Sequence, residues 1–111
     1  MTQFDKEILA PFFEEWESIR EEIAALYAQQ DRQVIGVMTT AIEKYQALLD
    51  YGGQEPNDRT GKIDYVLLPL NGEERFEFVK AKIASHYAYV QLDALYTETK
   101  KKVARLAIQK R

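Results

Sequence analysis

Residues 11–27 read PFFEEWESIREEIAALY, and this stretch decides the fold. Its apolar side chains recur every three or four residues, which is the period of an α-helix with one buried face. These positions are Phe12, Phe13, Trp16, Ile19, Ile23, Leu26 and Tyr27. Charged residues fill most of the positions between them, so the opposite face is solvated. Because proline suits the first turn of a helix, we expect a helix over residues 11–29 with Pro11 in its first turn.

The same period continues beyond Asp31, a residue type that caps helix starts by accepting a backbone hydrogen bond. The apolar positions here are Val34, Ile35, Met38, Ala41, Ile42, Tyr45, Leu48 and Leu49. Gly52 then ends the pattern, which predicts a second helix over residues 32–50. A connection of about two residues makes the two helices antiparallel neighbours. The alternative is one helix that bends near residues 29–31.

The helical period is lost between residues 52 and 70. Turn-forming residues interrupt this segment at Gly52-Gly53, Pro56-Asn57-Asp58 and Thr60-Gly61. Residues 63–68 are β-prone, but the sequence offers no second clear strand, and one strand cannot form a sheet alone. We therefore expect an irregular, extended segment packed over the helices. A functional loop is the second interpretation, because long loops in compact domains are often functional.

Two further helix starts follow this segment. Asn71 with Glu74 three residues later resembles a capping box, which predicts a third helix over residues 72–83. Ser85 can cap a fourth helix over residues 86–108, although the two could also form one long helix. The core-facing stripe of the fourth helix is Tyr89, Leu92, Tyr96, Thr99, Val103 and Leu106. Residues 1–111 are thus predicted to form a single all-α domain, an antiparallel bundle of about four helices with a long irregular segment between helices two and three.

The composition favours a soluble domain in the cytoplasm. Of the 111 residues, 46% are hydrophobic, which is enough for one modest core. The first ten residues carry Asp5, Lys6 and Glu7, which is wrong for a signal peptide, and no apolar run approaches the roughly 18 residues of a membrane span. The chain contains no cysteine, which excludes disulfides, thiolate metal sites and cysteine nucleophiles.

The residues needed for catalysis are also scarce. His86 is the only histidine and adjoins Ser85, but neighbours on a helix point in different directions and make a poor nucleophile–base pair. We interpret His86 as a half-buried histidine bonded to backbone or water. The chain has no Glu-x-x-His motif for a di-metal bundle, and Gly52-Gly53 lacks the features of a phosphate-binding loop. The sequence therefore predicts a protein that is not an enzyme and holds no cofactor or metal.

Charge is distributed unevenly along the chain. Residues 1–31 contain eight acids and two bases, whereas residues 72–111 contain five acids and nine bases. The last twelve residues contain no acid, and their bases are Lys100, Lys101, Lys102, Arg105, Lys110 and Arg111. Such a cluster can bind an anion, which would be nucleic acid or an acidic membrane surface. The structural interpretation, which we favour, is that these cations complement the helix dipole and the acidic first helix.

Aromatic residues are the candidates for a partner-binding surface. The chain has seven tyrosines and one tryptophan, most of which we expect to pack in the bundle. Tyr87 and Tyr89 are two residues apart on the fourth helix, so they cannot both face one core. We therefore predict a partner-binding face built from Tyr87, Tyr89 and Tyr96. The partner would be a protein, with a second copy of the chain as one possibility.

Three segments carry a resemblance to known proteins. They are residues 11–16 (PFFEEW), 68–76 (LPLNGEERF) and 89–96 (YVQLDALY). Together they resemble the YpoC-like family of small proteins from Bacillus-type bacteria. The resemblance implies a small helical protein and transfers no catalytic residue. The preferred function is therefore a non-enzymatic interaction protein or homo-oligomer, and the alternative is an anion-binding module that uses the basic tail.

Overall fold

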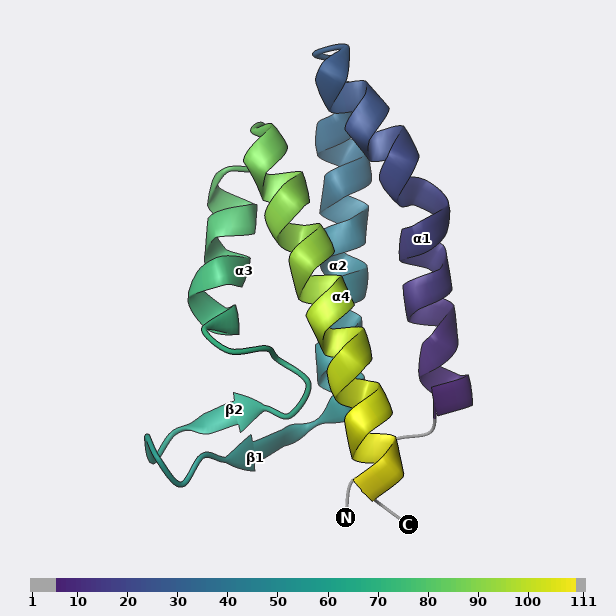
Figure 1. Ribbon diagram of the computed structural model, residues 1–111. Coiled ribbons are helices and arrows are strands. Elements are labelled where there is room, and N and C mark those ends of the chain that lie inside the picture. Colours follow the sequence, from purple (N-terminus) through teal and green to yellow (C-terminus); the bar gives the residue numbers. More distant parts are fainter. Residues whose placement is uncertain (1–5, 110–111) are drawn as a thin grey trace.

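The computed structural model of the chain describes residues 6–109, and their arrangement is shown in Figure 1. Within this range the chain forms the helices α1 (Lys6–Ala28), α2 (Gln33–Gly52), α3 (Gly72–Ala81) and α4 (His86–Gln109). The short strands β1 (Gln54–Pro56) and β2 (Ile63–Tyr65) lie between α2 and α3. The predicted all-α fold is confirmed, with a small hairpin added to it.

Helix α4 is the central element. It runs antiparallel to α1 on one side and to α3 on the other, and α2 lies behind it in Figure 1. The principal extents are 46 × 30 × 16 Å, and the radius of gyration is 14.6 Å. A compact chain of this length would have a radius of gyration of about 13 Å. The bundle is therefore flattened, and side chains along the outer side of α4 stay exposed.

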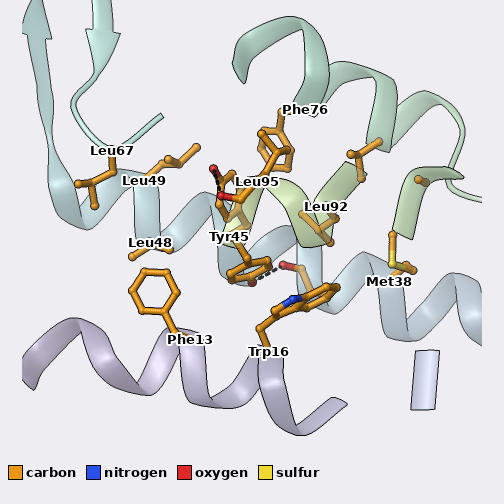
Figure 2. Packing of buried hydrophobic residues seen from close by; sticks show 14 of the residues in the cluster. Phe13, Trp16, Met38, Tyr45, Leu48, Leu49, Leu67, Phe76, Leu92 and Leu95 are labelled. Atoms are coloured by element: carbon orange, nitrogen blue, oxygen red, sulfur yellow. Dashed lines mark hydrogen bonds between the residues drawn. The ribbon is translucent and has the colours of Figure 1, made fainter. Parts of the chain in front are cut away.

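The core is organised around the fully buried ring of Tyr45 on α2. Its centroid lies 5.1 Å from that of Phe76 on α3 and 4.9 Å from that of Tyr96 on α4. Figure 2 shows Phe13 and Trp16 pointing from α1 into the same cluster of buried side chains. All four helices thus contribute large side chains to one cluster, so each is held by burial of apolar surface rather than by its own propensity alone.

A buried polar network runs through this core. The hydroxyls of Tyr45 and Thr99 are 2.7 Å apart, and Thr99 Oγ1 donates to the backbone oxygen of Leu67 at 3.1 Å. Polar groups buried in this way are costly unless they are hydrogen-bonded. The network satisfies all three groups and fixes the segment after β2 against α2 and α4.

Helix α1 begins at Lys6, so the expectation that Pro11 lies in its first turn is wrong. Pro11 lies inside the helix on its exposed side, where the missing N–H removes one backbone hydrogen bond. The helix extends upstream because Leu9 is fully buried in the core. Burying such a side chain contributes about 1.5–3 kcal/mol, which is comparable to the cost of about 3 kcal/mol for an internal proline.

The helices are separated as the capping residues predict. Asp31 Oδ1 accepts a hydrogen bond from the backbone N–H of Gln33 at 2.9 Å, although the N-cap residue of α2 is Arg32, one position later than predicted. Ser85 Oγ accepts from the backbone N–H of Tyr87 at 3.1 Å in the same way at the start of α4. Residues 82–85 form turns between α3 and α4. Both single-helix alternatives are therefore wrong.

The predicted capping box at Asn71 is also wrong. Helix α3 does begin after Asn71, but its side chain makes no capping hydrogen bond. The backbone of Asn71 adopts the left-handed conformation with φ of 56°, a region that asparagine tolerates better than most residues. This conformation directs the chain from the preceding loop into the helix.

The expectation that residues 52–70 contain no paired strand is likewise corrected. Strands β1 and β2 pair in antiparallel fashion. Asn57 organises the connection, because its Oδ1 accepts from the backbone N–H of Arg59 and its Nδ2 donates to Asp64 Oδ2, each at 2.9 Å. The remainder of the segment is irregular, and Leu67 anchors it in the core.

Candidate functional site

The first candidate surface lies on the outer side of α4 near its start. Tyr87 is 72% exposed, and Val90, one turn further on, is 49% exposed. The Nε of Arg75 on α3 donates to Gln91 Oε1 on α4 at 2.8 Å, so these two residues lie next to each other on the neighbouring helices. Phe78 lies one turn beyond Arg75, in the direction of the start of the antiparallel α4, and is 40% exposed. We name Phe78, Tyr87 and Val90 the aromatic patch.

The other two tyrosines predicted for this face point inward. Tyr96 is buried, stacks on Trp16 with ring centroids 4.6 Å apart and donates to the backbone oxygen of Ala41 at 3.0 Å. It therefore cannot form part of a partner-binding surface. Tyr89 is half-buried against Trp16 and Tyr27, and burial raises the pKa of its hydroxyl. The seven-residue spacing of Tyr89 and Tyr96 places both on the core-facing side of α4.

The single histidine lies at the edge of this region. His86 is exposed rather than half-buried, and its ring meets the edge of Tyr27 with centroids 5.8 Å apart. Ser85 Oγ is engaged with the α4 backbone instead of with His86. No group of three or more potential metal ligands occurs among residues 6–109, and no helix in that range is both long and apolar enough to cross a membrane.

The basic residues lie at the other end of α4. Lys100, Lys101 and Arg105 are exposed, and Lys100 lines the same groove as Glu14 and Glu17 of α1. The ion pairs found among the described side chains involve none of these three residues. Lys110 and Arg111 lie outside the described residues. Among the described residues, Glu14 and Glu17 of α1 therefore form no ion pair with these three cations, and they share a groove with Lys100 alone.

Lys102 differs from its neighbours because it is partly buried. Its Nζ donates to the backbone oxygen of Leu68 at 3.0 Å. Burial lowers the pKa of this amine, and the nearby charge of Arg105 lowers it further. Lys102 thus ties α4 to the loop before α3, and this contact removes it from the cations that an external anion could reach freely.

A groove of 510 Å³ runs between α1 and α4 near the basic residues. Its apolar lining includes Ala10, Phe13, Val103 and Ala104. Glu14 and Glu17 of α1 form one charged wall, and Lys100 of α4 stands on the other. We name this feature the α1–α4 groove. No local sequence pattern predicts this groove, because it depends on the packing of two helices that are far apart in the chain.

A comparison with protein families covers the three segments that carry the resemblance, residues 11–16, 68–76 and 89–96. A family model for the YpoC-like protein matches residues 6–111. The chain belongs to this family. Searches of curated proteins and of solved structures gave no match. The three YpoC-like segments meet in the structure, where they supply Trp16, Phe76 and Tyr96 to the core around Tyr45. In this member of the YpoC-like family, the three segments therefore contribute to the core of the fold.

Proposed function

We propose that this YpoC-like protein is a non-enzymatic interaction module of the cytoplasm that docks another protein through the aromatic patch. The observation that carries the proposal is the 72% exposure of Tyr87 on α4, a helix whose inner side is buried in the core. A large aromatic side chain with a polar hydroxyl is a typical anchor residue of protein interfaces.

The neighbours of Tyr87 support this role. Val90 and Phe78 expose apolar surface beside it, and the aromatic patch combines elements that are rigidly joined. Arg75 fixes α3 to α4 because its guanidinium makes two hydrogen bonds to the carboxylate of Glu98, at 2.9 and 2.7 Å. A preordered surface loses less conformational entropy on binding than a mobile one, which favours docking at this position.

Affinity capture from an extract of the protein's own cells tests the proposal. A partner should be retained by the wild-type chain and lost with Tyr87→Ala, because truncating an anchor costs about 2 kcal/mol or more, roughly 30-fold in affinity. The matched control is Tyr51→Ala, which removes another exposed tyrosine, 49% accessible, at the end of α2. Recovery of the same partners with Tyr87→Ala, or of no reproducible partner at all, would contradict the proposal.

A second candidate function is the binding of a polyanion by the basic end of α4. The exposure of Lys100, Lys101 and Arg105 on one end of the helix favours it, while the neighbouring Glu14 and Glu17 oppose it. Binding of DNA, RNA or anionic vesicles should then weaken steeply with added salt, because neutralised phosphates release counterions. Affinity that is undetectable at low salt, or unchanged when all three cations are replaced by alanine, excludes this function.

A further inference from the structure

We propose that the α1–α4 groove is a self-association surface, filled by the same groove of a second copy of this chain. The groove lies at the opposite end of α4 from the aromatic patch. The proposal therefore does not depend on Tyr87 or on the partner that the aromatic patch would bind.

The charges that flank the groove have few partners within the chain. Among the side chains described, residues 7–106, Glu14 and Lys100 take part in no ion pair. Among these pairs, Glu17 contacts only Arg20 on its own helix, at 3.6 Å, and the side chain of Glu17 is 56% exposed. Such an exposed pair contributes little to stability, so these charges remain free to interact across an interface.

The arrangement of the two walls makes the groove complementary to itself. Its acidic wall is on α1 and its basic wall on α4, and an apolar floor separates them. A two-fold axis along the groove lays α1 of one copy over α4 of the other at the same height. Glu14 and Glu17 of each copy then face Lys100 of the other copy, and symmetry makes this contact twice. A groove of one charge sign would repel its own copy.

The shape of the groove also fits helix packing. Ala10 and Ala104 are small, so helices of a second copy can approach closely over Phe13 and Val103 on the floor. The groove runs between two long helices of a flattened molecule with principal extents of 46 × 30 × 16 Å, so a second copy can lie along this side. Pairing through this side would give α1 and α4 of both copies a four-helix arrangement and cover the groove.

Analytical ultracentrifugation of the full chain over a range of concentrations tests this proposal. The wild-type protein should form dimers, and Glu14→Lys or Lys100→Glu alone should weaken dimerisation about tenfold or more, because like charges then face each other twice. An equimolar mixture of the two variants should restore dimers. The new lysine at position 14 of one variant then faces the new glutamate at position 100 of the other, and the unchanged Glu14 and Lys100 face each other. Glu22→Lys makes the same charge change on α1 outside the groove and should dimerise like the wild type.

Circular dichroism on each variant shows whether it is folded, and exposed positions such as these should leave the melting temperature nearly unchanged. Tyr87→Ala should also dimerise normally, which separates this proposal from the function of the aromatic patch. A wild-type chain that remains monomeric at every concentration overturns the proposal, even if another protein binds the groove. Failure of the mixed variants to associate overturns it as well.

Discussion

The indole Nε1 of Trp16 donates a 2.8 Å hydrogen bond to Oδ1 of Asp93, and this contact joins α1 to α4. Arg20 donates to the same oxygen at 3.2 Å. The indole N–H can only donate, and Trp16 is buried, so it needs an acceptor within the fold. One carboxylate thus helps to set how α1 lies against α4, and with it the position of both walls of the groove.

Replacing Asp93 with alanine should lower the free energy of unfolding by about 1–3 kcal/mol, because the indole N–H loses its acceptor. Asp93→Asn keeps an amide oxygen at the same place and should lose less. Urea denaturation measures both changes, with the exposed Glu22→Ala as a control expected within about 0.5 kcal/mol of the wild type. Equal losses for Asp93→Ala and the control would show that the contact does not stabilise the fold.

The Tyr45–Thr99 pair should behave as a coupled unit. Thr99→Val keeps the shape of the side chain but leaves the Tyr45 hydroxyl and the Leu67 carbonyl poorly satisfied, which costs about 1–3 kcal/mol. Adding Tyr45→Phe removes the hydroxyl that Thr99→Val leaves without its partner. The double variant should therefore lose less free energy of unfolding than the sum of the two single losses. A double-mutant cycle in urea should give a coupling energy of about 0.5–3 kcal/mol. Strict additivity would rule out the network as a stabilising element.

Two glycines of α2 should respond to alanine in opposite directions. A Cβ added at Gly52 would lie 2.5 Å from both Cγ and Cδ1 of Leu67, so Gly52→Ala should overpack the contact and destabilise the protein by about 1–3 kcal/mol. Gly36 has no atom within 4 Å of that position. Gly36→Ala should therefore stabilise the helix by about 0.5–1 kcal/mol. Thermal unfolding followed by circular dichroism compares the two variants. A higher melting temperature for Gly52→Ala would contradict the close contact between Gly52 and Leu67.

Stability should also fall at alkaline pH because of Tyr27. Its hydroxyl donates to the backbone oxygen of Ile83 at 2.7 Å, and burial raises its pKa from 10.0 to about 12. The folded state therefore holds this proton more tightly than the unfolded state. The resulting stabilisation is complete below pH 10 and is lost as the pH rises from 10 toward 12. Urea unfolding across this window should show a steeper decline for the wild type than for Tyr27→Phe, and parallel curves would exclude the effect.

The helices could be predicted because their signals are local or periodic. The spacing of Phe13, Trp16 and Ile23 reflects burial on one side of α1, and all three are in the core. Asp31 and Ser85 mark helix starts through hydrogen bonds to nearby backbone, which short sequence motifs encode directly. The start of α1 was missed because the favourable burial of Leu9 comes from tertiary packing, which the position of a proline does not reveal.

The hairpin and the groove depend on interactions that a local pattern does not record. Residues 54–56 are Gln-Glu-Pro, which are not β-prone, and they form β1 because β2 lies alongside to pair with them. The turn residues around Asn57 were the available signal for this hairpin. The aromatic patch was partly predictable, since the two-residue spacing required either Tyr87 or Tyr89 to be exposed. The α1–α4 groove appears only when Glu14 and Lys100 are brought together by folding.

The central position of α4 has a consequence for biosynthesis. This helix packs against α1, α2 and α3, yet it follows all three along the chain. While the ribosome is still making α4, Tyr45 and Trp16 lack the ring of Tyr96 that packs against both of them. The nascent chain should therefore expose apolar surface until α4 emerges, a period in which chaperones could bind it. For this protein, folding is therefore expected to await the synthesis of α4 rather than to proceed gradually helix by helix.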